Sequence, residues 1–386
     1  MKKTLLITII ILAVLLLLPA VSFIRWAFQD KKPMNIVILD KTVPTLERLD
    51  HRSFVYVLTN GRFVKDNKGG SYSAKKDYYG FFPLRPVREK QFRKRDFRLT
   101  ELIDLAENND ALYYTDTYGV FFNDWYQGIK KTRRSRKLYG GLNNNDYLLM
   151  SEMNKRNKLV VLEYNTFDYP TAGLERFKTE ELLGITFNGW TGCFYKSLDT
   201  TSTEGVPDWM PDLYRKQYMQ PWTFSKPGVV LLRENSIVVL EEGKQLVSAM
   251  PVITTSKENA EKYRLPQSVT FSNNFDVIDP GQNDVISTFN LKTTPAGDTL
   301  LSVNDLHAVF PAVTRGTAKS NTYYFSGDFA TNKVPFWTAR LRNMDKIAKT
   351  FIYSENENDD ERFFWLYYKP LINTIFGDYQ ASSSGK

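Results

Sequence analysis

Short apolar runs that end in polar residues recur through the first half of this 386-residue chain. Four of them have the length and composition of buried strands, at residues 35–39, 54–58, 111–114 and 159–162. Helix-like stretches at residues 99–106 and 146–154 precede the third and fourth runs. Apolar strands that alternate with helices predict a parallel sheet covered by helices on both faces. We therefore expect residues 34–205 to form an α/β core.

The second half of the chain is rich in short strand-like runs separated by turn residues. Residues 229–232 and 237–240 flank a polar turn and predict an antiparallel hairpin. An aromatic-rich amphipathic stretch at residues 361–376 is expected to pack on the core as a terminal helix, and a second membrane contact is the alternative. We expect residues 206–386 to form a β-rich extension that completes or packs on the core. Its other strand-like runs lie at residues 269–271, 285–291, 299–303 and 322–325.

An apolar run at residues 5–24 opens the chain. As a helix it is long enough to cross the hydrocarbon core of a membrane. It ends at Arg25 and Trp26, residue types that anchor spanning helices at the interface. We expect residues 1–33 to be a signal anchor that passes once through the inner (cytoplasmic) membrane, with the globular part on the extracytoplasmic side. A cleaved signal peptide is the alternative, because the run closes on small residues suited to a peptidase.

Charge and cysteine content limit the classes of partner. The net charge is +8, and two stretches are strongly basic, at residues 62–98 and 130–137. The first is too long for an ordinary connection and is expected to be functional or mobile. Both are suited to acidic lipid, a polyanionic glycan or an acidic protein. They match no nucleic-acid-binding module, so no nucleic-acid partner is expected. Cys193 is the single cysteine, so the chain forms no internal disulfide.

Residue types that bind metal ions or act as nucleophiles are scarce. Of the two histidines, His51 is expected at the surface and His307 in a loop or at a strand edge. Two histidines are too few for a histidine-rich metal site. Cys193 lies among aromatic residues and is expected to be a small buried hydrophobic side chain. No glycine-rich phosphate loop of a common spacing is present. We therefore expect no metal and no cofactor.

Polar residues follow the predicted strands at the ends where parallel sheets bind their ligands. A mixture of carboxylates, amides and an aromatic ring suits a hydroxyl-rich ligand. A structural role is the alternative, because Asp, Asn and Thr also cap helices and close turns. The candidate ligand-binding residues are Asp40, Asn60, Asp116, Tyr118, Glu163, Asn165 and Asp328. Asp116 and Glu163 are also the candidate acid and base if the site is catalytic.

The order of features in the first half is the basis of a family resemblance. The strand at residues 111–114 is followed by Gly140 and Gly141, by Asp146 at the start of a helix, by the strand at residues 159–162, and by a helix that closes onto a new strand at residues 179–185. In this order the chain resembles the class I glutamine amidotransferase-like fold, which is a flavodoxin-like α/β domain. The resemblance is to the catalytically silent form that accompanies glycosidases and other extracytoplasmic carbohydrate proteins.

The resemblance also bears on chemistry. Active members of that family place a cysteine after the strand that here ends in Glu163, with a distant histidine and glutamate. This chain has no cysteine at that position. The resemblance therefore implies the scaffold without amidotransferase activity.

Three functions follow from these expectations. The first is a membrane-anchored extracytoplasmic binding or scaffolding protein, with a role in envelope polysaccharide handling, and the sequence favours it over an enzyme. The second is an envelope hydrolase that uses paired carboxylates. The third is an interaction subunit of a membrane complex, in which the basic stretches contact acidic lipid or protein.

Overall fold

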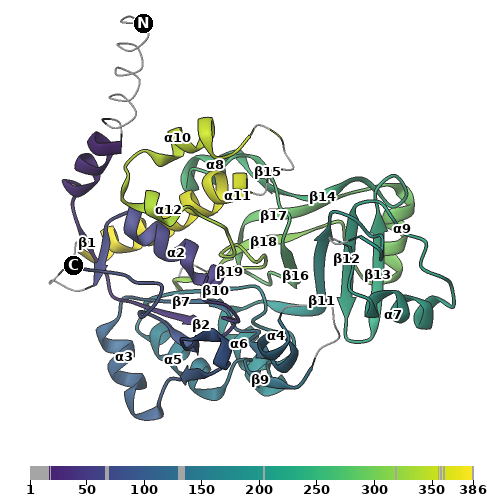
Figure 1. Ribbon diagram of the computed structural model, residues 1–386, viewed down its shortest axis with the longest axis horizontal. Coiled ribbons are helices and arrows are strands. Elements are labelled where there is room, and N and C mark those ends of the chain that lie inside the picture. The colour runs from purple at the N-terminus through teal and green to yellow at the C-terminus, as the bar shows by residue number, and fades with distance from the viewer. Residues whose placement is uncertain are drawn as a thin grey trace, which may run out of the picture.

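The computed structural model describes residues 17, 19–65, 69–128, 135–202, 205–317, 320–354, 356, 359 and 361–384. The described residues contain a ten-stranded mixed sheet (Figure 1). Its strands lie in the order β15-β14-β17-β18-β19-β10-β7-β2-β5-β6. In that order they are Ser268–Thr270, Leu246–Thr255, Asp284–Thr293, Val309–Arg315, Thr322–Phe325, Leu159–Glu163, Ala111–Asp116, Ile36–Asp40, Tyr79–Pro83 and Phe92–Arg95.

The centre of this sheet is parallel. Strands β19, β10, β7, β2 and β5 run in the same direction, each hydrogen-bonded to the next. The strands expected at residues 35–39, 111–114 and 159–162 are β2, β7 and β10, so the predicted α/β fold with a parallel core is confirmed. Strand β19 comes from the second half of the chain and pairs with β10 on one side and with β18 on the other. The carboxyl ends of the parallel strands therefore meet at one edge, where ligands of such sheets bind.

Side chains of the central strands alternate between two apolar cores, one on each face of the sheet. In β10, Val161 packs in the first core, and Val160 and Leu162 pack in the second. Both faces therefore carry helices, as the apolar character of the whole strand predicts. The first face is covered by α2 (Leu49–Asn60) and α12 (Lys369–Ser384), and the second by α3 (Leu102–Asn108), α5 (Asn144–Lys155) and α6 (Gly173–Leu183).

The strand expected at residues 54–58 is wrong, because these residues belong to helix α2. Every residue from Ser53 to Thr59 is buried between the sheet and the C-terminal helices. A helix that is apolar all round gives the same continuous run as a buried strand, so the period of the sequence could not separate them. Asn60 consequently ends a helix and not a strand.

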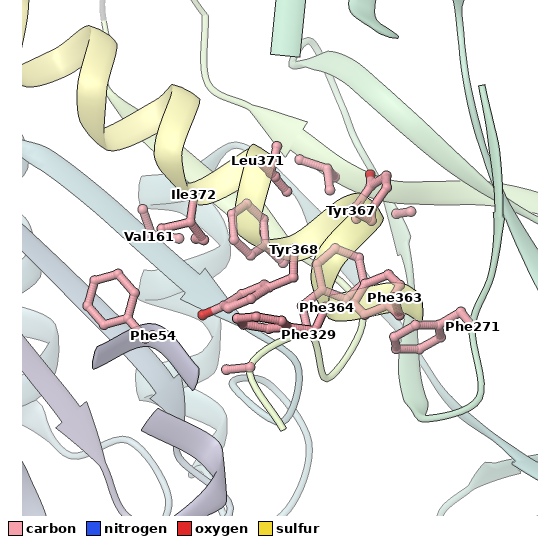
Figure 2. Close-up of a cluster of buried hydrophobic side chains, with 14 of the residues drawn as sticks. Phe54, Val161, Phe271, Phe329, Phe363, Phe364, Tyr367, Tyr368, Leu371 and Ile372 are labelled. Carbon is pink, nitrogen blue, oxygen red and sulfur yellow. The ribbon is translucent and has the colours of Figure 1, made fainter. Parts of the chain in front are cut away.

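The C-terminal segment packs on the core, as expected. It consists of α11 (Glu361–Phe363), the π-helical turn η4 (Phe364–Tyr368) and α12. Each large apolar side chain buried in this way contributes about 1.5–3 kcal/mol to folding. Figure 2 shows Phe363, Phe364, Tyr367, Tyr368, Leu371 and Ile372 of this segment with Phe54, Val161, Phe271 and Phe329, all at most 5% exposed.

A second, antiparallel sheet has the order β13-β12-β11-β16. Strands β12 and β13 form the hairpin that the sequence predicts. Helix α7 (Trp209–Tyr218) packs on this sheet (Figure 1). The four strands are Ser236–Glu241, Gly228–Arg233, Thr186–Tyr195 and Asn274–Asp279.

The strand expected at residues 299–303 is also wrong, because these residues belong to helix α9 (Pro295–Val303). The Thr294 side chain accepts a hydrogen bond from the Gly297 N–H, and Pro295 occupies the first turn. A threonine cap followed by proline starts a helix, so Thr294 and Pro295 mark a helix N-terminus and not a turn between strands.

The basic stretch at residues 62–98 contains strands and is not one long connection. It holds β3 (Phe63–Lys65), β4 (Gly70–Ser71), β5 and β6. Basic side chains of β6 are exposed at the edge of the large sheet, where charge discourages pairing with another chain. Of the second basic stretch, residues 130–134 lie outside the described residues.

The remaining short elements are β1 (Lys32–Pro33), β8 (Val120–Phe121), β9 (Lys137–Tyr139), α4 (Phe122–Tyr126), α8 (Lys257–Tyr263), α10 (Met344–Phe351), η1 (Val87–Glu89), η2 (Leu99–Glu101) and η3 (Phe336–Arg340).

Most of the apolar leader, residues 1–16 and 18, lies outside the described residues. Within the part that is described, no helix is both long enough and apolar enough to cross a membrane. Residues 19–27 are helical and pack on the body. Trp26 is 7% exposed, and its Nε1–H donates to the Thr59 carbonyl at 3.0 Å. The Trp26 side chain therefore packs on the body of the protein, whereas most of the run expected to be a membrane anchor lies outside the described residues.

Candidate functional site

A pocket of about 920 Å³ opens at the carboxyl ends of the parallel strands. One side of it is formed by residues at or after those ends, among them Asp116, Asn165 and Asp328. The other side is formed by the second sheet and α7, with Cys193 on β11 and Trp209 on α7. The pocket thus combines the strand ends that the sequence singles out with a wall that comes from later in the chain.

Asp116 ends β7, and its two carboxyl oxygens have different hydrogen-bond partners. Its Oδ1 accepts hydrogen bonds from the Thr42 hydroxyl at 2.6 Å and from the Tyr118 backbone N–H at 2.7 Å. Its Oδ2 has a weaker donor, the Asn165 amide at 3.5 Å. Burial, and then the charge of Asp328, raises the pKa of Asp116 to about 8. Asp116 therefore holds a proton at neutral pH, and Oδ2 is the oxygen that can carry it.

Two more carboxyls line the same pocket, Asp328 after β19 and Asp50 in the first turn of α2. Burial raises the pKa of Asp328 to about 6. Burial, followed by the charges of neighbouring carboxylates, raises the pKa of Asp50 well above its usual range. The Thr331 hydroxyl donates to Asp50 at 2.6 Å. These carboxyls therefore exchange protons at pH values where most carboxyls are already ionised.

The described lining of the pocket is acidic, although the chain as a whole is basic. Its one lysine or arginine is Arg176, whose guanidinium already pairs with Glu180 at 3.1 Å. The carboxyl side chains in the lining are Asp50, Asp116, Asp124, Asp168, Glu234 and Asp328. A negative charge placed in this pocket would meet repulsion, whereas a neutral or positive group would not.

Aromatic rings and amides make up much of the remaining lining. Rings offer flat apolar faces with a polar edge, and amides both donate and accept hydrogen bonds. The rings are those of Tyr118, Phe121, Tyr164, Phe167, Tyr169, Tyr195 and Trp209, and the amides are those of Asn165, Asn235 and Asn274. Asn165 has a left-handed backbone with φ of 65°, a conformation that asparagine tolerates better than most residues.

Four of the seven candidate residues are brought together by the structure. Asp116, Tyr118, Asn165 and Asp328 line the pocket. Asn60 does not, because it ends helix α2, where its amide donates to the carbonyls of Ala339 and Leu341. The other two, Asp40 and Glu163, end strands at the same edge of the sheet but turn their carboxyls into the interior.

Asp40 is fully buried beside His51. The Nδ1 atom of His51 lies 2.5 Å from Oδ2 of Asp40, and neither side chain is exposed. The expectation that His51 is a surface residue is therefore wrong. His307, by contrast, lies in the connection between α9 and β18, as expected, and is exposed.

Glu163 is fully buried, and both of its carboxyl oxygens are occupied. One oxygen accepts the hydroxyl of Tyr113, and the other accepts the backbone N–H groups of Phe329 at 3.0 Å and Ala330 at 2.9 Å. Glu163 thus ties the end of β10 to the segment after β19. This is a structural role, of the kind that competes with ligand binding at strand ends.

Cys193 is half-buried and lines the pocket, whereas the sequence predicts a buried hydrophobic side chain. Burial raises the pKa of its thiol to about 12. A thiol of this kind is protonated at neutral pH and is a poor nucleophile. The Cys193 thiol is therefore not suited to act as a nucleophile at neutral pH.

Several lining residues were not among the candidates. Tyr164 directly follows β10, so its place at a strand end was a usable signal. Asp50 gave no such signal, because it belongs to α2, part of which we expected to be a strand. Tyr195 and Trp209 gave none, because they belong to β11 and α7, which lie far along the chain from these strand ends. Among the described residues, no group of three or more His, Cys, Asp or Glu side chains is placed to hold a metal ion.

Comparisons with known proteins give distant likenesses. No protein-family profile matches the chain, and no curated protein matches it in sequence. Among solved structures, a β-galactosidase from Bacillus circulans sp. alkalophilus aligns over 77% of this chain and 30% of its own length, with 9% identity and a TM-score of 0.33. A protein described as ThuA-like from Bacteroides uniformis ATCC 8492 aligns over 92% of this chain and 94% of its own length, with 9% identity and a TM-score of 0.37.

A β-galactosidase from Rahnella sp. R3 aligns over 90% of this chain, with 10% identity and a TM-score of 0.35. The chain spans about 30% of the length of the two β-galactosidases.

Proposed function

We propose that this protein binds a hydroxyl-rich ligand of the saccharide class in the pocket between the two sheets. The observation that carries the proposal is the joint presence of a protonated Asp116, ionisable Asp328 and a set of amides and aromatic rings in one pocket. A protonated carboxyl donates a hydrogen bond and an ionised one accepts, which suits neighbouring hydroxyls of a sugar. Aromatic faces cover the apolar C–H faces of such rings. A pocket of about 920 Å³ is within the size range of small-molecule sites.

The charge of the lining narrows the ligand class. Because Arg176 is already paired with Glu180, the described carboxyls face no free cation inside the pocket. A saccharide that carries carboxylates or phosphates would be repelled, so the ligand is neutral or carries an amine.

The proposed setting is an extracytoplasmic domain on a membrane anchor, in envelope polysaccharide handling. We infer that its α/β body is a silent amidotransferase-like scaffold. The parallel core supports this inference, and so does the chemistry of the site, because the Cys193 thiol is protonated and His51 is buried beside Asp40. Binding is therefore favoured over amidotransfer.

Hydrolysis is the second candidate, and one observation favours it. A carboxyl with a pKa of about 8, such as Asp116, is a competent general acid at neutral pH. Its partner as base would be Asp328, which lines the same pocket with a pKa of about 6. Glu163 is not suited to this role, because both of its oxygens are held by donors of the fold.

Substitutions at Asp116 separate the two functions. In Asp116→Asn the side-chain oxygen can still accept from Thr42 and Tyr118 while the amide donates toward the pocket, so binding is expected to persist within about threefold. Asp116→Ala removes that donor and is expected to weaken binding at least about tenfold. Calorimetric titration with neutral, amine-bearing and uronate-bearing oligosaccharides measures both effects.

The matched control is Asp305→Asn, at an exposed position where φ is 56° and asparagine is tolerated. If the protein is a hydrolase, Asp116→Asn abolishes turnover while binding persists. Absence of binding to all three kinds of oligosaccharide, or equal affinity in Asp116→Ala and the parent, would refute the proposed site.

A further inference from the structure

We propose that the body of this protein lies flat against an anionic lipid surface through one defined patch, independently of what the pocket binds. The patch, called here the docking face, consists of the exposed apolar side chains Leu17, Val21, Ile24 and Phe28 together with Trp337 and Ile347. It comes from three segments of the chain, so it is a property of the folded body and not of the leader alone.

The first part of the docking face is one side of the N-terminal helical segment. Leu17, Val21, Ile24 and Phe28 follow a spacing of four, three and four residues, which places them on a single helix face. Their side chains are 61%, 45%, 52% and 86% exposed. Apolar side chains grouped in this way on a free surface indicate an interaction site.

The opposite side of the same segment is fixed to the body. The Ser22 hydroxyl donates to the Arg342 carbonyl at 2.7 Å, and Trp26 donates to Thr59. The guanidinium of Arg62 lies 4.5 Å from the centroid of the Trp26 ring. Because this side is held by the protein, the exposed side is presented in a fixed direction.

The second part of the docking face follows directly from that attachment. The segment around Arg342 joins η3, which carries Trp337 at 75% exposure, to α10, which carries Ile347 at 37% exposure. Figure 1 shows α10 and the N-terminal segment at the same end of the molecule. Exposed cations accompany these apolar side chains, and they are Arg25, Arg340, Arg342, Lys346 and Lys349.

A lipid surface is the occupant that these features fit. The docking face continues a run of apolar residues that begins at Leu5, so the chain enters the patch from an apolar segment. Exposed tryptophan and aliphatic side chains among lysines and arginines are the composition of elements that lie in a membrane interface. Each such cation near an anionic leaflet strengthens the attraction to the lipid surface.

Site-directed labels test this contact in the full-length protein. In a Cys193→Ala background, a nitroxide is attached to Trp337→Cys or Ile347→Cys, and the protein is reconstituted in vesicles of phosphatidylglycerol and phosphatidylcholine. The controls are Met219→Cys and Val303→Cys, which replace apolar residues that are 86% and 77% exposed near α7 and α9, at the other end of the molecule. Accessibility to oxygen and to a water-soluble nickel chelate is measured by power saturation.

Labels on the docking face are expected to show an oxygen-to-nickel ratio at least about threefold above the controls. Arg340→Glu, Lys346→Glu and Lys349→Glu together should abolish the difference, as should about 0.5 M salt, because both remove the attraction to headgroups. The matched triple change Arg93→Glu, Lys94→Glu and Arg95→Glu, on the exposed strand β6, should leave it intact. Equal ratios at all four positions, or shielding of the docking face from both reagents, would overturn the proposal, the second result pointing to a protein partner.

Discussion

Asp40 and His51 contact each other in the interior of the protein, and neither side chain is exposed. Nδ1 of His51 lies 2.5 Å from Oδ2 of Asp40, and its Nε2 lies 2.7 Å from the carbonyl of Ala74, which can only accept. Nε2 must therefore carry a hydrogen, and one further proton lies between Nδ1 and the carboxyl. The pair has no net charge whichever of the two atoms holds that proton, which makes its complete burial tolerable.

Replacing His51 with alanine should therefore destabilise the fold. The substitution leaves the Asp40 carboxyl buried without its partner, and removal of one member of a buried pair costs about 3–5 kcal/mol. Urea unfolding measures the effect. His307→Ala changes an exposed side chain and should alter stability by less than about 0.5 kcal/mol. An unchanged unfolding midpoint in His51→Ala would contradict a stabilising role for this buried pair.

Tyr113→Phe tests the structural role of Glu163. The Tyr113 hydroxyl donates to Glu163 and lies 3.0 Å from the Tyr368 hydroxyl, so it links the end of β10 to the C-terminal segment. Its loss should cost about 1–3 kcal/mol, because Glu163 is left with a buried oxygen that has lost its donor. Binding to the pocket should be unchanged in folded protein. A large loss of affinity without a loss of stability would instead place Glu163 in the site.

The stability of the protein should fall as the pH rises from about 4 to about 8. Asp116 has a pKa of about 8 in the folded state and an ordinary value of 3.8, so between these values the folded state binds more protons than the unfolded state. Its contribution to stability is therefore full below pH 3.8 and is lost as the pH approaches 8. Asp328, with a pKa of about 6, acts in the same direction. Denaturant titrations across this range should show a shallower fall for Asp116→Asn, which cannot ionise.

Ligand affinity should also depend on whether Asp116 is protonated. If protonated Asp116 donates to the ligand, affinity in the parent protein should decline as the pH passes about 8, where the donor is lost. The affinity of Asp116→Asn should stay constant across this range, because its amide remains a donor. Parallel declines in parent and variant would assign the pH dependence to another group.

Cys193 should react slowly with alkylating reagents in the folded protein. With a thiol pKa of about 12, only about one molecule in ten thousand carries the thiolate at pH 8. Unfolding in urea returns the thiol to its ordinary pKa and should accelerate iodoacetamide labelling by more than about a hundredfold. Fast labelling of the native state would show that the thiol is activated and would reopen nucleophilic chemistry at this position.

The sequence by itself determined the strands β2, β7 and β10 and the burial of the C-terminal segment. In these elements the local pattern is sufficient: continuous apolar runs of strand length separated by helices require a sheet that is covered on both faces. It also placed Asp116 and Asn165 at strand ends, because a polar residue directly after a buried strand has little freedom to lie elsewhere. The scarcity of histidine and cysteine followed from composition alone.

Only the tertiary structure decided which strand ends share a pocket. Asp328 joins Asp116 because β19, from the second half of the chain, pairs with β10, a contact between residues more than 150 positions apart that no local period encodes. Tertiary packing also made residues 54–58 a helix and turned Asp40 and Glu163 inward, because His51 and the backbone after β19 supply their hydrogen bonds there. A local sequence pattern records whether a side chain is buried and with what period, whereas its partners depend on which distant segments pack against it.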